Sequence, residues 1–234
     1  MTSLITADSS PAPLPMEKPL LILEELISLF LPYAEPLQEK RRGNGNLHLH
    51  ENNSLAVALV TEGEVNVYHR SDMMLLATAR APFIFGFQGS LFQYKLFKFE
   101  PAKNSKISLL PREKALKLAI KYHVFPQVLA YQTYLSDYQA NRNNLLINRT
   151  SLHIVCGLLE ELSKVEPEER HSIGVSNYIL ARSNLARSGI MRIIATLREE
   201  GFIAVENGKL IQLVKPFPDS KPAKPHKFVA DESA

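Results

Sequence analysis

The sequence predicts an α+β fold in which an antiparallel β-roll is followed by a long helix and then by a C-terminal winged helix-turn-helix. Residues 46–110 form short apolar runs separated by turn residues, which is typical of a small antiparallel roll. A glycine-free helical pattern follows Pro126. Residues 185–211 then pass from helical spacing through Gly201 into two strand-like runs, an order typical of a recognition helix with a wing.

The composition is that of an ordinary globular protein. Hydrophobic residues make up 45% and charged residues 22% of the 234, and the net charge is only +3, so any surface for nucleic acid must be local. The single cysteine excludes an internal disulfide and an iron–sulfur cluster held by four cysteines. It also fits a reducing compartment, and we expect a cytoplasmic protein.

The run "PLLILEELISLFLP" near the N-terminus is predicted to be an amphipathic helix and not a membrane segment. Glu24 and Glu25 interrupt it, and it is too short to cross a bilayer. The chain as a whole is expected to divide into five segments. These are a disordered segment over 1–16, a roll-shaped sensor domain over 17–122, a dimerisation helix over 123–148, a winged helix-turn-helix domain over 149–216 and a disordered tail over 217–234.

Four runs predict the strands of the roll: "LAVALV", "EVNVYHR", "MMLLATA" and "YKLFKFE". They are rich in β-branched or aromatic residues or alternate in hydropathy, and turn residues such as Glu62–Gly63 and Ser71–Asp72 separate them. After Pro111 the period changes to that of a helix, first in "REKALKLAIKYH" and then in the long helix.

The long helix carries a seam at spacings of three and four, which favours a parallel homodimer. The seam residues are Val128, Tyr131, Leu135, Tyr138, Arg142 and Leu145. The alternative is that this helix packs on the roll of its own chain, and the spacing leaves both interpretations open.

The C-terminal pattern begins with the helix "RTSLHIVCGLLEELSK", capped by Asn148 or Thr150, in which Cys156 is expected to be a buried structural thiol. A short helix at "SNYILARS" follows, with Ser176 or Asn177 as its cap. The next helix has one apolar stripe and ends at Gly201, and Asn-Gly between two strand-like runs predicts a hairpin. The stripe consists of Ile190, Ile193, Ile194 and Leu197.

Charge is distributed unevenly over this region. Residues 171–198 contain no Asp or Glu, whereas four arginines occur there: Arg182, Arg187, Arg192 and Arg198. A basic patch within a nearly neutral chain is typical of a nucleic-acid surface. The alternative, a solvated helix face with no partner, is made less attractive by the adjoining turn and hairpin.

A roll, a long helix and a winged helix-turn-helix in this order resemble the Crp/Fnr (cyclic-AMP receptor protein) family, whose roll is of the cyclic-nucleotide-binding type. The resemblance covers roughly residues 17–216, through "LVTEGEVNVYHR" and "APFIFGFQG" in the roll and "ARSGIMRIIATLREEGFIAVENGKLI" at the end. Within the family the sequence looks most similar to the enterobacterial inhibitors of hydrogen peroxide resistance. The resemblance therefore implies transcription regulation, homodimers, a palindromic operator in double-stranded DNA, RNA polymerase as a candidate partner and a link to oxidative stress.

The resemblance also implies roles for individual residues. Arg187 and Arg192 take the places of the family's two base-reading arginines, and Ser188 stands where a glutamate is common. We expect these three residues to meet base edges. The candidates for phosphate contacts are Asn177, Arg182, Arg198 and Lys209.

The region of the family's nucleotide site departs from the pattern. Gly86 is followed by Phe87 instead of the ribose-binding glutamate, and Gln93–Tyr94 replace the arginine pair that holds the cyclic phosphate. Lys95 or Lys98 could supply a charge, but a strand lysine that points to solvent is the simpler interpretation. We therefore expect no cyclic nucleotide, no cofactor and an unknown effector.

Two rival functions remain. His48 and His50 alternate on a strand, as a cupin metal enzyme requires, but Glu51 and Glu62 are badly spaced and only His69 is left as a further ligand. Hydrolase and phosphate-loop motifs are absent, so we expect a protein that is not an enzyme and holds no metal. The other rival is a roll that binds an apolar ligand. Its candidate residues are Phe83, Phe85, Phe87, Phe92, Phe97 and Phe99.

Overall fold

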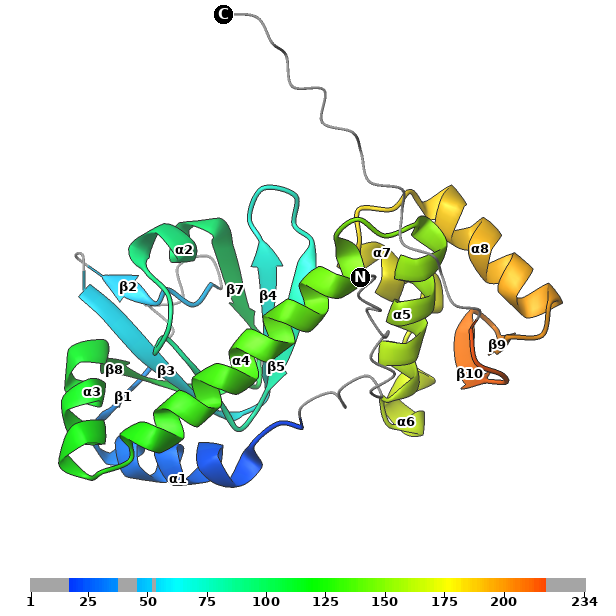
Figure 1. Ribbon diagram of the computed structural model, residues 1–234. Coiled ribbons are helices and arrows are strands. Elements are labelled where there is room, and N and C mark those ends of the chain that lie inside the picture. Colours follow the sequence, from blue (N-terminus) through cyan, green and yellow to red (C-terminus); the bar gives the residue numbers. More distant parts are fainter. Residues whose placement is uncertain (1–16, 38–45, 52–53, 218–234) are drawn as a thin grey trace, which may run out of the picture.

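The computed structural model describes residues 17–37, 46–51 and 54–217, so the segments predicted to be disordered lie almost entirely outside the described residues. A β-rich part and a C-terminal helical part lie at the two ends of one long helix (Figure 1). Within the described residues, no helix combines the length and the hydropathy that crossing a membrane requires. The predicted α+β order of roll, long helix and winged helix-turn-helix is confirmed.

The roll consists of two antiparallel sheets. One joins β1, β8, β3 and β2 in that order, with β6 also paired to β3, and the other has the order β5-β4-β7. The bounds are β1 Glu35–Pro36, β2 His50–Glu51, β3 Ser54–Glu62, β4 Glu64–His69, β5 Leu75–Arg80, β6 Phe83–Phe85, β7 Phe97–Pro101 and β8 Lys106–Pro111. Gly63 links β3 to β4 with φ +77°, and a Cβ there would lie 2.8 Å from the Ser105 Cα, so the turn requires glycine.

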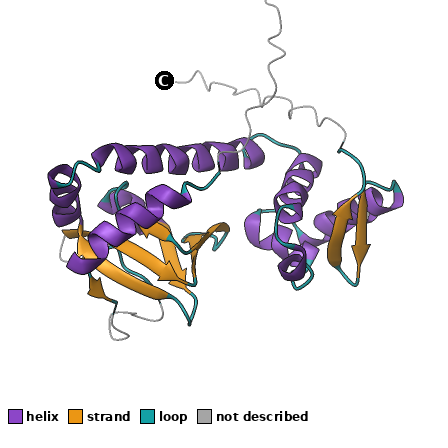
Figure 2. Ribbon diagram, turned by 90° about the horizontal axis from the view of Figure 1, so that it is seen from below, coloured by secondary structure: helices purple, strands orange, loops and turns teal. Residues whose placement is uncertain are grey.

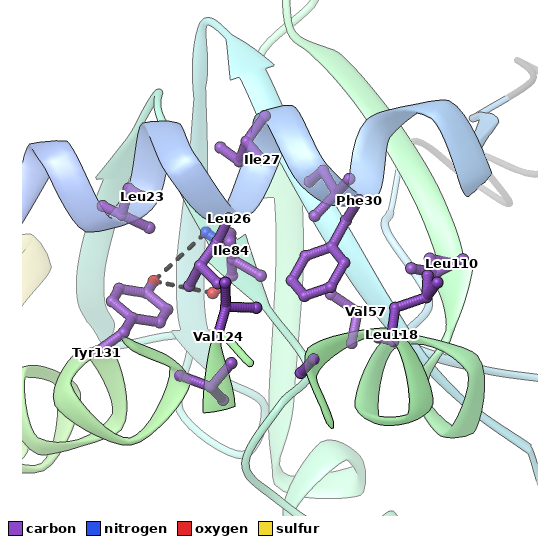
Figure 3. Close-up of a cluster of buried hydrophobic side chains, with 14 residues drawn as sticks. Leu23, Leu26, Ile27, Phe30, Val57, Ile84, Leu110, Leu118, Val124 and Tyr131 are labelled. Carbon is purple, nitrogen blue, oxygen red and sulfur yellow. Dashed lines mark hydrogen bonds between the residues drawn. The ribbon is translucent and has the colours of Figure 1, made fainter. Parts of the chain in front are cut away.

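Four helices accompany the roll: α1 Leu20–Phe30, which continues into a 3₁₀ turn at Leu31–Tyr33, α2 Leu91–Leu96, α3 Arg112–Lys121 and α4 Phe125–Leu146. Apolar residues of α1, α3 and α4 close one core against β3, β6 and β8 (Figure 3). The prediction of a strand from Tyr94 onward is wrong at its start. Ser90 caps α2 by accepting a hydrogen bond from the Gln93 N–H, and the strand begins only at Phe97.

The C-terminal part contains α5 Ser151–Ser163, α6 Pro167–Arg170, α7 Val175–Arg182, α8 Arg187–Glu199, β9 Ile203–Glu206 and β10 Lys209–Leu213. Thr150 caps α5 through the His153 N–H, as one of the two predicted caps. The predicted caps of α7 are wrong, because Gly174 precedes the helix. Its first residue, Val175, is buried and donates its N–H to the Gly208 carbonyl, so the fold of the wing fixes where α7 begins.

The apolar stripe of α8 packs inward as predicted. Ile190, Ile194 and Leu197 are buried in the core shared by α5, α7 and the wing, and Ile193 packs against it. Gly201 ends the helix with φ +70°. The turn between β9 and β10 has positive φ at both Asn207 and Gly208, which is the conformation expected of an Asn-Gly hairpin.

The predicted dimer seam of α4 is largely covered by its own chain, although Tyr138 remains exposed. Val128 and Tyr131 belong to the roll core, where the Tyr131 hydroxyl donates to the Ile84 carbonyl at 2.9 Å (Figure 3). Leu135 also packs against this core. Leu145 belongs to the core of the C-terminal part. Val128, Tyr131 and Leu135 thus follow the alternative that the spacing had left open, packing on the roll of the same chain, whereas the contact of Leu145 with the C-terminal core was not expected.

The remaining two seam residues, Tyr138 and Arg142, lie where α4 passes from one core to the other. The Tyr138 hydroxyl donates to the Leu76 carbonyl of β5 at 3.4 Å, and Arg142 is buried. Figure 2 shows the roll on one side of α4 and no described element on the opposite side.

Candidate DNA-binding interface

The recognition helix α8 has a buried face and an exposed face. The exposed residues are Arg187, Ser188, Met191, Arg192, Thr196, Arg198 and Glu199. Ala186 precedes α8 and its side chain cannot cap the helix. The first backbone N–H groups of α8 are therefore left to other acceptors. An exposed helix N-terminus with arginines around it attracts anions.

Arg187 is positioned by the preceding helix. Its Nη2 donates to the Asn177 Oδ1 at 3.0 Å, which links the exposed side of α7 to the first turn of α8. Five of the predicted DNA contacts are exposed on these two helices, and Asn177 and Arg187 are in direct contact. The five are Asn177, Arg187, Ser188, Arg192 and Arg198.

The other two predicted contacts lie elsewhere. Arg182 stacks on the Tyr178 ring, with 3.8 Å from its Cζ to the ring centroid, and lines a groove between the roll and the C-terminal part. Lys209, in the wing, donates from Nζ to the Ser172 carbonyl at 2.6 Å. Lys209 is thus anchored at the wing, whereas Arg182 faces the roll and not the exposed side of α8.

Sequence reasoning missed Met191. It lies on α8 three residues after Ser188 and four after Arg187, and half of its surface is exposed. Its helical spacing from Arg187 and Ser188 could have identified it, but the candidates on this face were chosen for charge or polarity.

A carboxylate that the sequence reasoning did not single out lies next to the turn between α7 and α8. Asp72, in the turn after β4, accepts a hydrogen bond from the Asn184 Nδ2 at 3.4 Å. The Met74 backbone N–H lowers the pKa of Asp72, with smaller contributions from Asn184 and His69, so this group is ionised at neutral pH. The tip of the β4–β5 hairpin therefore contacts the helix-turn-helix directly.

Arg142 joins the roll to the DNA-binding part from inside the molecule. Its Nη2 donates to the Leu75 carbonyl of β5 and to the Arg182 carbonyl of α7, both at 3.2 Å. Its Nη1 lies 3.4 Å from the Glu161 Oε2 of α5. Burial raises the pKa of Glu161, and Arg142 opposes this only in part. A buried arginine with three partners on three elements fixes how these elements pack.

A cavity of about 560 Å³ lies between the roll and α4. Four of the six predicted phenylalanines line it, namely Phe83, Phe85, Phe97 and Phe99. Phe87 instead packs on Phe30, and Phe92 is 73% exposed.

The polar groups of the cavity are largely occupied. The Tyr94 hydroxyl donates to the Gln88 carbonyl at 2.5 Å, and burial raises the pKa of Tyr94. Lys98 does not line the cavity and pairs with Glu100 at 3.3 Å. Gly86 has φ +100°, and a Cβ there would lie 2.1 Å from the Ala56 carbonyl oxygen, so the turn over the cavity requires glycine.

His48 and His50 are poorly placed to bind a metal, and Cys156 is poorly placed for redox chemistry. The His48 and His50 rings meet edge to face with centroids 6.4 Å apart, and no cluster of three or more metal-ligating side chains occurs among the described residues. Cys156 is buried in α5, where burial and then Glu160 raise its pKa to about 12. A thiol with this pKa holds little of the nucleophilic thiolate at neutral pH.

Comparisons with known proteins agree with this geometry. The family "Winged helix-turn-helix DNA binding" matches residues 151–219. The inhibitor of hydrogen peroxide resistance of Salmonella typhimurium is 27% identical over 159 residues, which cover 66% of this chain and 75% of that protein.

Two solved structures share the fold of most of this chain. The c-di-GMP-responsive global regulator CLP of Xanthomonas campestris has a TM-score of 0.58 and 15% identity, over 82% of this chain and all of that one. A CooA variant from Carboxydothermus hydrogenoformans has a TM-score of 0.58 and 13% identity, over 78% of this chain and 82% of that one. The chain therefore has the fold of a Crp/Fnr-type transcriptional regulator, with a winged helix-turn-helix of the DNA-binding kind and sequence similarity to the inhibitors of hydrogen peroxide resistance.

Proposed function

We propose that the chain is a homodimeric transcriptional regulator that binds a specific DNA sequence. The observation that carries this proposal is the outer face of α8, where Arg187, Ser188 and Arg192 are exposed while the opposite stripe is buried. In a winged helix-turn-helix the second helix lies in the major groove. Such docking needs a free polar face on that helix, and the stretch 171–198, which holds most of α8, contains no Asp or Glu.

In this proposal Arg187 and Arg192 contact base edges, since a guanidinium can bind the O6 and N7 of guanine with two parallel hydrogen bonds. Ser188 can donate to or accept from either kind of base pair. Asn177, Arg198 and Lys209 contact phosphates. Arg182 is the exception, because it would reach a phosphate only after the roll and the C-terminal part had moved apart.

The second copy would pack on the face of α4 that its own chain leaves free. That face carries exposed residues at spacings of three and four: Phe125, Leu129, Thr133, Ser136, Ala140 and Asn144. Two such faces related by a two-fold axis form a self-complementary contact. Two α8 helices would then meet half-sites of a palindrome about one DNA turn apart.

We propose further that the roll does not take cyclic nucleotide. A cyclic phosphate requires a free guanidinium, whereas Arg142, the one arginine among the described cavity residues, is already bound to two carbonyls and a carboxylate. An aromatic lining around about 560 Å³ suits a small, neutral and largely apolar effector. This effector role is the second candidate function of the roll.

A link to oxidative stress is the least direct part of the proposal. It is supported by the names of similar proteins in Salmonella typhimurium and Escherichia coli. The buried, high-pKa Cys156 argues against direct sensing of peroxide by this thiol. We therefore propose that the link to oxidative stress lies in the genes that the protein regulates, and not in a reaction of Cys156 with peroxide.

Selection of random-core duplexes by the purified protein, at near-physiological salt, tests the function. The control is a variant in which Arg187 and Arg192 are both replaced by alanine. We expect the wild type to enrich a palindrome and the variant to enrich nothing. The selection is repeated with small apolar compounds added as candidate effectors. If the wild type enriches no sequence either with or without them, the proposed function is contradicted.

A further inference from the structure

Met191 is an exposed apolar residue in the middle of the polar face of α8. Half of its surface, 51%, is accessible, and it belongs to none of the described hydrophobic cores. The other large apolar residues of α8, which are Ile190, Ile193, Ile194 and Leu197, are buried or packed against the C-terminal core. Stability of the domain therefore gives little reason for a methionine at this position.

Helix geometry places this side chain beside the proposed base readers. Met191 lies one turn after Arg187 and Ser188, and side chains on a helix point back toward its N-terminus. The Met191 thioether thus projects over the turn that carries Arg187 and Ser188. This is the end of a recognition helix that contacts base edges.

We propose that Met191 determines specificity by packing on the C5-methyl group of a thymine in the operator. The inference rests on the proposed function, because it assumes that α8 lies in the major groove. Of the four bases, only thymine presents an apolar group in that groove. A flexible, polarisable thioether adapts to such a methyl group, while Arg187 and Arg192 suit guanine.

The test replaces single thymines by uracil, which removes only the methyl group, in the operator found by selection. We expect wild-type affinity to fall about fourfold at one thymine in each half-site, the equivalent of one methyl group lost from a buried contact. Met191→Ala should bind the thymine operator more weakly by a similar factor. It should also no longer distinguish thymine from uracil at that position.

Two further variants control for general effects of a lost methionine. Met191→Leu keeps an apolar side chain and should retain the discrimination. Met73→Ala removes a methionine of similar exposure, 47%, from the roll and should respond to uracil as the wild type does. Equal responses of wild type and Met191→Ala at every thymine would overturn the role of Met191 while leaving the operator intact. If no operator is enriched, the proposed function fails, and this inference fails with it.

Discussion

Two helices of this protein, α8 and α4, show the same kind of spacing but use it differently. In α8 the stripe that includes Ile190 and Ile194 packs on its own domain, and the opposite face is free. In α4 the seam was assigned to a second chain, yet Val128 and Tyr131 lie in the core of their own roll. Spacing tells which residues share a face, but it does not tell which surface covers that face.

The largest expected effect separates the two faces of α4. Tyr131→Ala should lower the free energy of unfolding by about 3–5 kcal/mol, because a fully buried ring and its hydrogen bond to Ile84 are lost. Leu129→Ala, on the exposed face, should change the stability of the single chain by less than about 0.5 kcal/mol. Urea unfolding measures both. Leu129→Ala should instead weaken dimerisation, which sedimentation experiments measure. If Leu129→Ala lowered the free energy of unfolding more than Tyr131→Ala does, the assignment of the two faces of α4 would be reversed.

Arg142 was assigned to the dimer seam, but its hydrogen bonds are to three elements of its own chain. Arg142→Met should cost about 3 kcal/mol, because it leaves Glu161 and two backbone carbonyls without their buried partner. Arg198→Met, on the free face of α8, serves as the control and should cost less than about 0.5 kcal/mol. Similar costs for the two variants in urea unfolding would show that Arg142 does not hold the parts together.

The free face of α8 should respond in DNA affinity and not in stability. Arg192→Ala should lose about 1–3 kcal/mol of affinity for the operator and relax preference at one base position. Lys209→Ala should weaken operator and scrambled duplexes alike and reduce the salt dependence. Fluorescence anisotropy titrations measure both. Equal losses on both duplexes for Arg192→Ala would remove it from the base readers.

Gly189 offers a stability test of the same free surface. No described atom outside its own helix lies within 4 Å of a Cβ built there, and its φ is that of an ordinary helix. Gly189→Ala should therefore raise the free energy of unfolding by about 0.5–1 kcal/mol. Gly201→Ala, at φ +70°, should lower it by about 1–2 kcal/mol. A destabilised Gly189→Ala protein would mean that something within the fold covers this face.

The smallest effect is a pH dependence that arises beside Arg142. Burial raises the pKa of Glu161, so the folded protein holds this proton more tightly than the unfolded chain does. The resulting stabilisation is complete below the ordinary value of 4.5 and is lost as pH rises through the folded pKa. As pH rises through the folded pKa, the free energy of unfolding of Glu161→Gln should therefore increase relative to that of the wild type. A difference in the free energy of unfolding that stays constant with pH would contradict the raised pKa.

Local signals in the sequence predicted local structure well. Gly201 and the pair Asn207–Gly208 adopt the positive φ values that their positions require, and the apolar stripe of α8 is buried. These features depend on neighbours within a few residues, which the sequence displays directly.

Features that depend on distant contacts were missed. The strand expected at Tyr94 became part of α2, which is capped from Ser90, and α7 begins where Val175 meets the wing. Arg142 was assigned to a dimer because its partners on β5, α5 and α7 are far away in the sequence. Met191 was missed for another reason, since an apolar residue on an exposed face carries no charge signal.

The central claim is that α8 reads a DNA sequence, and one affinity ratio tests it most directly. The measurement compares the selected operator with a scrambled duplex at near-physiological salt, for the wild type and for the variant with alanine at Arg187 and Arg192. We predict a ratio of about 1,000 or more for the wild type and a ratio near one for the variant. A wild-type ratio near one, or a ratio that the two substitutions leave unchanged, would contradict the claim.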